Sequence, residues 1–311
     1  MIEQPLILYV PGLLPKPEAA MHREALLRCL LAGVRRVDAE VATAIESRAQ
    51  CFDIISWTFD FYGEHRDFSL DAAAVDAVIE QPHALQRDID EATSLRRRAV
   101  RWLFTLGDWM PFLIPHIASE RMQLHLRDLR RYTLNRNEIA EHTRNMLKIA
   151  LRAAAEAHRP ILLLAHSMGS VIAYEALWQM SRSHKDKIDV DLLLTMGSPL
   201  GQRYIQRRIK GYDEIGTRRY PDNARGWINV TAVGDLTAID PKLGDDFAEM
   251  IELGLVESID DYEVYNYFRL AGELNVHSEY GYLVNKKIAQ IITDWWRAAE
   301  PRFTTARDSA E

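Results

Sequence analysis

The segment that most constrains the fold is an apolar stretch at residues 161–180, whose pattern changes at a serine. Residues 161–165 are all apolar and follow Pro160, which is typical of a strand buried on both faces. From Gly169 onward the apolar residues recur at every third or fourth position, which predicts a helix that packs one face on a core. Ser167 lies between the two patterns, so the sequence predicts a strand, a tight turn with a serine at its tip, and a helix.

The residues on either side of Ser167 indicate a nucleophile. In a nucleophile elbow a serine occupies a sharp strand-to-helix turn, and small residues two positions before and two positions after it let the turn pack without a clash. Ala165 and Gly169 occupy these positions, with Ala165 standing where glycine is more usual. The alternative is a serine that only caps the helix.

Length and composition limit the class of protein. The chain has 311 residues, of which 48% are hydrophobic and 27% charged, which is ordinary for a globular protein. We expect a single domain over residues 1–311, with residues 61–135 as a mainly helical insertion or cap. The 38 basic and 45 acidic side chains give a net charge of -7, which argues against a protein that binds nucleic acid through its phosphates.

Three further patterns concern the compartment and possible cofactors. The first residues contain no basic region and no cleavage site before an apolar strand, so we expect a cytoplasmic protein. No uninterrupted apolar run is long enough to span a membrane. Cys29 and Cys51 lack CxxC spacing and neighbouring histidines, so we expect buried thiols and no metal site or disulfide. No organic cofactor is implied.

Strand-like and helix-like segments alternate outside residues 61–135. Apolar runs predict strands at residues 6–10, 51–59, 161–165, 190–196 and 227–233. Helical patterns cover residues 18–34, 38–48, the segment from Asn135 to Pro160, 169–180 and 283–296, and Glu138 follows Asn135 at capping-box spacing. This alternation predicts an α/β fold, with a mostly parallel central sheet and helices on both of its faces.

These features together resemble serine hydrolases of the α/β-hydrolase fold, and lipases and esterases in particular. In that fold the serine, the acid and the histidine follow one another along the chain, each after the carboxyl end of a strand. Ser167, Asp235 and His277 follow this order, and residues 275–280 and 197–201 are similar to the histidine loop and to the strand end after the elbow. The resemblance covers the strands, the elbow helix and the carboxyl third, but not residues 61–135.

The resemblance implies a role for each of these residues. Ser167 attacks a carbonyl carbon, His277 takes the serine proton, and Asp235 orients and stabilises the imidazole. The backbone N–H of Met168 and one N–H from the loop after the first strand would hold the oxyanion. Pro11 has no N–H, so Leu13 is the predicted second donor and Gly12 the alternative.

The acid and the histidine have rivals in the sequence. Asp240, which precedes Pro241, and Asp60, at the end of an earlier strand, compete with Asp235. Four other histidines are assigned lesser roles: His166 is expected to point away from the serine, His142 and His158 to be solvated on the long helix, and His116 to lie at the surface or in packing.

Residues 61–135 carry the least specific pattern. Arginines precede an aromatic-rich apolar stretch, which suggests peripheral membrane contact through residues 99–118. The same stretch also fits a lid over an acyl-binding cleft, or helices packed on the main domain with solvated arginines.

The sequence therefore predicts a serine hydrolase that cleaves a carboxylic ester, from a small molecule or a lipid, through an acyl-enzyme on Ser167. An acyltransferase or a thioesterase would use the same three residues. A binding protein that keeps the fold without activity is the alternative of another class.

Overall fold

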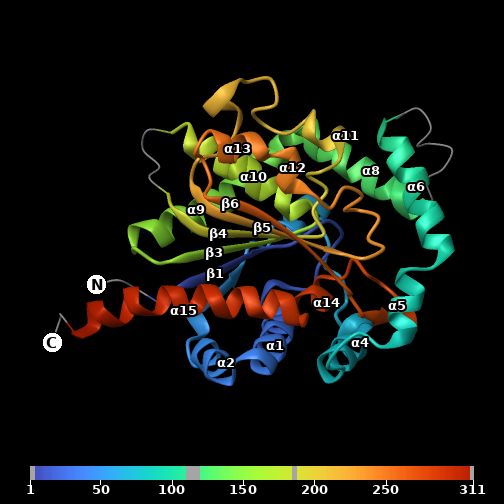
Figure 1. Cartoon of the computed structure of the whole chain (residues 1–311), viewed down its shortest axis with the longest axis horizontal. Coiled ribbons are helices and arrows are strands. Elements are labelled where there is room, and N and C mark those ends of the chain that lie inside the picture. Colours follow the sequence, from blue (N-terminus) through green and yellow to red (C-terminus); the bar gives the residue numbers. More distant parts are fainter. Residues whose placement is uncertain (1–3, 110–119, 184–187, 309–311) are drawn as a thin grey trace.

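The architecture is a central parallel sheet between two layers of helices (Figure 1). The computed structural model describes residues 4–109, 120–183 and 188–308. Its six-stranded sheet has the order β2-β1-β3-β4-β5-β6, and every neighbouring pair is parallel. The strands are β1 (Leu6–Val10), β2 (Phe52–Ile54), β3 (Ile161–His166), β4 (Val190–Met196), β5 (Ala224–Ala232) and β6 (Ser258–Val264). This confirms the predicted α/β fold class.

The apolar runs of the central strands are buried on both sides, as a sheet covered on two faces requires. In β1, Ile7 and Tyr9 contribute to one core cluster, while Leu6, Leu8 and Val10 contribute to the other. The two cores therefore lie on opposite faces of the sheet, because successive side chains of a strand alternate between its faces.

Each face is covered by its own set of helices (Figure 1). One layer contains α1 (Ala19–Val37), α2 (Ala39–Glu46), α4 (Ser69–Glu80), α14 (Glu279–Leu283) and α15 (Lys286–Asp308). The other contains α3 (Thr58–Tyr62), α8 (Glu120–Thr133), α9 (Ile139–Glu156), α10 (Met168–Ser181), α11 (Arg203–Gln206), α12 (Leu243–Asp246) and α13 (Ala248–Glu252).

The remaining elements are short helices, one longer helix and a pair of two-residue strands. They are η1 (Ala49–Cys51), α5 (Gln86–Ala92), α6 (Leu95–Trp109), η3 (Arg136–Glu138), η4 (Gly216–Arg219) and the antiparallel pair β7 (Arg269–Leu270) and β8 (Glu273–Leu274). Among the helices between residues 61 and 135, α4 packs through Val75 and Val78 into the core cluster that contains Ile7 and Tyr9.

Three predicted elements differ from the structure. The strand expected at residues 51–59 is only β2, because Trp57 and Phe61 have helical spacing and pack edge to face across α3, with ring centroids 5.5 Å apart. The last helix is divided at Asn285, whose side chain accepts a hydrogen bond from the Lys287 amide at 2.9 Å. The long helix begins at Ile139 rather than near Asn135.

The reason for the last difference lies in the backbone. Asn135, Asn137 and Glu138 all have positive φ, so the chain turns before the helix starts. The Asn135 side chain still caps the helix, because its Oδ1 accepts from the amides of Ala140 and Glu141 at 3.0 and 3.1 Å. The predicted cap by Asn135 is therefore present, whereas Glu138 directly precedes the helix and does not form the predicted capping box.

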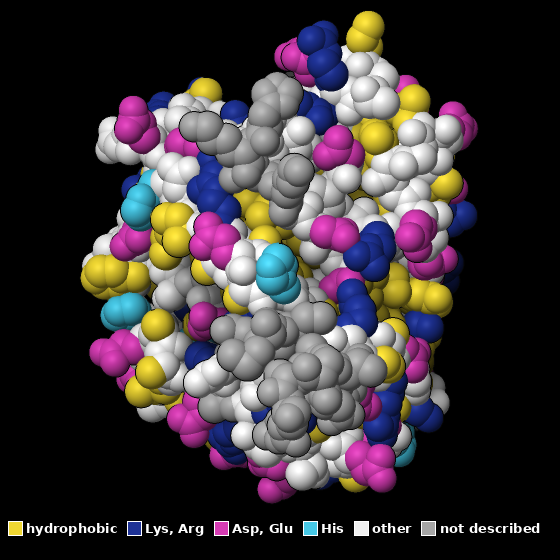
Figure 2. Space-filling view, turned by 90° about the vertical axis from the view of Figure 1, so that its left-hand side faces the viewer, with side chains coloured by type: hydrophobic (Ala, Val, Ile, Leu, Met, Phe, Trp, Pro, Cys, Tyr) yellow, Lys and Arg dark blue, Asp and Glu magenta, His cyan; other side chains and the backbone are white. Residues whose placement is uncertain are grey.

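The face that carries both chain termini shows acidic and basic side chains interspersed, without a large field of one sign (Figure 2). Among the helices of the described residues, none combines the length and the apolar character that crossing a membrane requires.

Candidate active site

Ser167 occupies a strained turn between β3 and α10. Its backbone has φ 54° and ψ -127°, a conformation that a residue with a side chain adopts only when its surroundings enforce it. The Ser167 amide donates to the Met196 carbonyl at 2.9 Å, which ties the turn to β4. A Cβ atom on Gly169 would lie 2.2 Å from the Val10 carbonyl oxygen, so only glycine lets α10 approach the end of β1 this closely.

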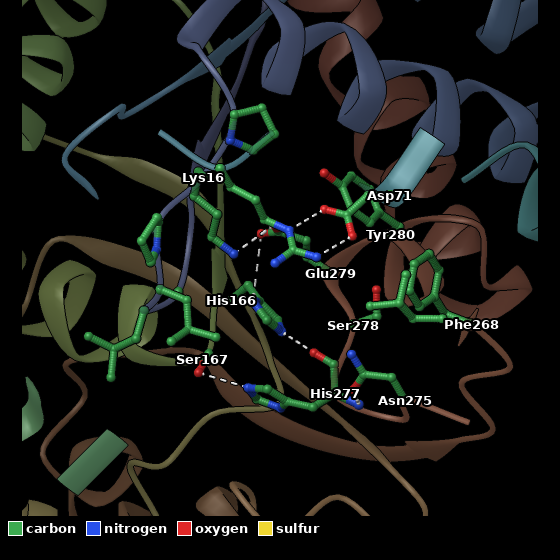
Figure 3. A pocket seen from close by; sticks show the side chains of 17 residues that line it. Lys16, Asp71, His166, Ser167, Phe268, Asn275, His277, Ser278, Glu279 and Tyr280 are labelled. Carbon is green, nitrogen blue, oxygen red and sulfur yellow. Dashed lines mark hydrogen bonds and ion pairs between the residues drawn. The ribbon is translucent and has the colours of Figure 1, made fainter. Parts of the chain in front are cut away.

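Two hydrogen bonds connect Ser167 to a histidine and an acid from distant parts of the chain. Ser167 Oγ lies 2.9 Å from His277 Nε2, and His277 Nδ1 lies 2.8 Å from Asp235 Oδ2. Asp235 follows β5, and His277 lies in the loop between β8 and α14. Figure 3 shows the hydroxyl of Ser167 facing the imidazole of His277. The structure thus brings together the three predicted residues.

The surroundings of Asp235 keep its carboxylate charged and oriented. Its oxygens accept from the Thr237 amide at 2.8 Å and from the Tyr282 hydroxyl at 2.9 Å, in addition to His277. Burial alone would raise the pKa of Asp235, but His277 and these donors together hold it below the usual value. The carboxylate is therefore ionised at neutral pH, so Nδ1 of a neutral His277 carries the proton and Nε2 is the acceptor that faces Ser167.

A glycine makes room for this arrangement. Gly197, just after β4, has φ 56°, and a Cβ atom there would lie 2.9 Å from Asp235 Oδ2 and 3.0 Å from His277 Nδ1. A side chain would therefore press on both partners of the acid–histidine hydrogen bond.

The loop after β1 runs directly beside the serine. A Cβ atom on Gly12 would lie 2.7 Å from Ser167 Cβ and 3.2 Å from its Oγ. Leu14 has φ 77°, and its amide donates to the Tyr62 hydroxyl at 3.0 Å. The predicted oxyanion donors, the amides of Leu13 and Met168, belong to this loop and to the first residue of α10, and their role stays a prediction.

The rival acids are engaged elsewhere. Asp240 accepts from the Lys242 amide at 3.1 Å within a turn, as a residue before a proline often does. Asp60 lies 2.9 Å from the exposed His142. Of the three candidate acids, the structure brings only Asp235 to His277.

His166 corrects an expectation, because it does not point away from the site. It is buried, its ring centroid lies 4.7 Å from that of His277, and its Nε2 lies 2.9 Å from the His277 carbonyl oxygen, to which it donates. Burial, followed by the charge of His277, lowers the pKa of His166 to about 3, so its ring is neutral.

The other histidines differ less from expectation. His142 is exposed on α9, as predicted, whereas His158 is exposed just beyond the end of that helix. His116 lies outside the described residues. Cys29 and Cys51 are buried free thiols. Within residues 4–109, 120–183 and 188–308, no group of three or more His, Cys, Asp or Glu side chains is arranged to hold a metal ion.

Sequence reasoning missed a second buried polar cluster behind His277. Glu279 accepts from the Tyr9 hydroxyl at 3.0 Å and from Lys16 Nζ at 2.8 Å, and it lies 3.0 Å from His22 Nε2. Burial alone would raise the pKa of Glu279, but Lys16 and His22 hold it well below the usual value. His166 lies between Glu279 and His277 (Figure 3). In the sequence, the only sign of this cluster is that Glu279 comes two positions after His277. An acidic residue at this place is equally typical of an exposed helix start.

A cavity of about 130 Å³ opens beside Ser167. Residues 12–17 form part of its lining, and Phe268, Leu270 and Tyr280 contribute aromatic and aliphatic side chains to it. Lys16 and Arg66 also line it, and Arg66 makes a two-pronged ion pair with Asp71 at 2.7 and 2.8 Å. The cavity thus combines an apolar wall with charged groups that are already paired.

Comparison with known proteins agrees with this architecture. The family described as alpha/beta hydrolase of unknown function (DUF900) matches residues 120–199, which contain the elbow and the strands on either side of α10. No curated protein and no solved structure matches the chain. The match covers 80 of the 311 residues, and the parallel sheet and the elbow are consistent with the α/β-hydrolase fold of that family.

Proposed function

We propose that this protein is a serine esterase that cleaves a carboxylic ester through an acyl-enzyme on Ser167. The observation that carries the proposal is the pair of hydrogen bonds, 2.9 and 2.8 Å long, that joins Ser167 Oγ to His277 and His277 to Asp235. A serine hydroxyl is a weak nucleophile at neutral pH, and an aligned neutral imidazole is the group that activates it.

The reaction then follows in two halves. Ser167 Oγ attacks the ester carbonyl carbon while its proton moves to His277 Nε2, and Asp235 stabilises the resulting imidazolium. The same proton passes to the alcohol oxygen as the ester bond breaks, which leaves an acyl group on Ser167. Water repeats the sequence on the acyl-enzyme, releasing the acid and restoring the serine.

The negative oxygen of each tetrahedral intermediate requires fixed donors. The amides of Leu13 and Met168 are the proposed pair, because the first follows the glycine that touches Ser167 and the second starts α10. The hydrogen bond from the Leu14 amide to Tyr62, and from Tyr62 to Asp128 at 3.0 Å, holds this loop in place.

Labelling with a fluorophosphonate probe tests the nucleophile directly. The wild-type protein should be labelled, Ser167→Ala should not, and Ser47→Ala, which changes an exposed serine at the end of α2, should be labelled like wild type. A folded wild-type protein without label would favour a binding protein that has no hydrolase activity.

A series of nitrophenyl esters with increasing acyl length then tests the reaction. Release of nitrophenol that depends on both Ser167 and His277 supports an esterase. A rate that rises when an alcohol acceptor replaces water, with ester as the product, would indicate an acyltransferase. Selective turnover of acyl thioesters over the matching oxygen esters would indicate a thioesterase.

A further inference from the structure

Helix α6 turns an apolar stripe toward the solvent. The exposed fractions are 80% for Leu95, 66% for Trp102 and 37% for Leu103. An α-helix turns by about 100° per residue, so these three side chains fall within an arc of about 100° on one side of α6. An amphipathic helix on a globular protein normally directs such a stripe into the core. Over residues 95–103, the apolar stripe of α6 therefore faces the solvent instead of the core.

Exposed arginines flank this stripe. With the same rotation of about 100° per residue, Arg96 lies on one side of the arc and Arg98 on the other, and both are exposed. Residues 94–103 contain four arginines and no acidic residue, although the chain has a net charge of -7. The outer surface of α6 is thus apolar along its centre and basic along both margins.

The opposite side of α6 is fastened to the candidate active site. Arg97 Nη2 donates to the Leu274 carbonyl at 2.8 Å, and Arg101 Nη2 donates to the Ile239 carbonyl at 3.1 Å. Leu274 comes three residues before His277, and Ile239 comes four residues after Asp235. The helix stands at one end of the molecule, outside both helical layers (Figure 1).

We infer that the outer face of α6, made by Leu95, Arg96, Arg98, Trp102 and Leu103, docks on a bilayer that contains anionic lipids. Apolar side chains would enter the boundary between headgroups and acyl chains, and Trp102 suits that boundary because it is both large and amphipathic. Arg96 and Arg98 can extend their side chains along the stripe to reach lipid phosphates.

A second copy of the chain fits this face less well. Two copies that joined their stripes would bring the arginine margins of one against those of the other, and like charges at an interface oppose association. A surface of negative lipid headgroups has no such conflict. The docking face only overlaps the segment expected to contact membranes, residues 99–118, through Trp102 and Leu103, and residues 110–118 of that segment lie outside the described part of the chain.

Docking would also orient the site that we propose for catalysis. Because Arg97 and Arg101 donate to carbonyls of the segments that lead to His277 and away from Asp235, a bilayer against the outer face of α6 would lie on the same side of the molecule as these two segments. The inference concerns binding and holds whether or not the protein is an esterase.

Co-flotation of the full chain with lipid vesicles tests the inference. We expect the protein to float with vesicles of phosphatidylcholine and phosphatidylserine, and much less with phosphatidylcholine alone. Leu95→Ser/Trp102→Ser should weaken this binding by at least about tenfold, because most of the inserted apolar surface is lost. Ile215→Ser is the matched control, since Ile215 is 80% exposed elsewhere on the surface, and its binding should equal that of wild type.

Charge reversal supplies an independent comparison. Arg96→Glu/Arg98→Glu should abolish the preference for phosphatidylserine. Arg28→Glu/Arg35→Glu changes the net charge equally, at exposed positions of α1, and should keep that preference. The inference is overturned if the wild-type protein stays below the anionic vesicles, if both charge variants lose binding equally, or if sedimentation shows a dimer that Leu95→Ser/Trp102→Ser converts to a monomer.

Discussion

Replacing Glu279 with glutamine tests the buried cluster behind the candidate triad most sharply. The change keeps the size of the side chain, but the amide has one acceptor oxygen in place of two, so it cannot accept both from the Tyr9 hydroxyl and at the oxygen that faces Lys16 and His22. The change also removes the negative charge that Lys16 Nζ contacts at 2.8 Å. The Lys16 and Glu279 side chains are 14% and 5% exposed, so the pair is largely shielded from solvent.

The magnitude follows from this burial. Removing one partner of a buried ion pair costs about 3–5 kcal/mol, because the other charge is left without compensation. Since Lys16 retains some exposure and its long side chain can turn toward water, we expect the lower end, a loss of about 3 kcal/mol in the free energy of unfolding. The double variant Lys16→Met/Glu279→Gln should lose less free energy of unfolding than the two single variants together, by about 1–3 kcal/mol.

Urea unfolding of the variants measures these values. Glu46→Gln is the control, because Glu46 forms an exposed pair with Arg35 at a similar distance, 2.9 Å, and should lose less than about 1 kcal/mol. A loss below about 1 kcal/mol for Glu279→Gln as well would refute the conclusion that the buried charge needs its partner.

The pH dependence gives a second readout of the same change. The pKa of Glu279 is lowered in the folded state, so its charge contributes stability above the ordinary pKa of 4.5, and this contribution is lost as the pH falls below that value. Wild type and Glu279→Gln should therefore differ most near neutral pH and converge in acid. A difference that stays constant from neutral pH to below pH 4.5 contradicts the assignment.

Three further substitutions test the candidate triad and its frame. Asp235→Asn should lower kcat on a nitrophenyl ester by on the order of 10³–10⁴, while Asp240→Asn leaves it nearly unchanged; the reverse result would move the acid to Asp240. Tyr282→Phe removes a hydrogen bond to a buried carboxylate and should cost about 2–3 kcal/mol in urea unfolding, whereas a neutral effect would make that bond dispensable. Gly169→Ala should lower the free energy of unfolding by more than about 3 kcal/mol, because its Cβ would lie 2.2 Å from the Val10 carbonyl oxygen. Gly63→Ala, whose Cβ would have no atom within 4 Å, should lower it by about 1 kcal/mol. Similar losses for the two variants would refute the steric argument.

The elements that carry the candidate triad could be predicted because their signals are local. The change of period at Ser167 identifies β3 and α10, and β4 and β5 show as apolar runs closed by glycine. Chain order then selected Asp235 and His277 without any knowledge of distances. The fold class followed from the same alternation of strands and helices.

Features that depend on distant contacts could not be predicted in this way. Glu279 is a charged residue whose burial depends on Tyr9, Lys16 and His22, more than 250 positions away in the sequence. The orientation of the His166 side chain could not be predicted, because its Nε2 bonds to the carbonyl oxygen of His277, which is far away in the sequence. The edge strand β6 was missed, since its acidic and apolar residues show little of the continuous hydrophobicity of the central strands.

The two margins of the sheet have a consequence for how the protein behaves at high concentration. An unpaired strand edge offers free amides and carbonyls to any other extended chain, and proteins suppress this by shortening or charging their outermost strands. β2 has three residues, and the opposite margin, β6, exposes Asp260 and Glu263. β2 is too short to serve as a template for a further strand, and the charges on β6 disfavour one there. Both edges of the sheet therefore oppose aggregation by strand addition, and the exposed apolar side chains of α6 lie on a helix, where they offer no strand edge.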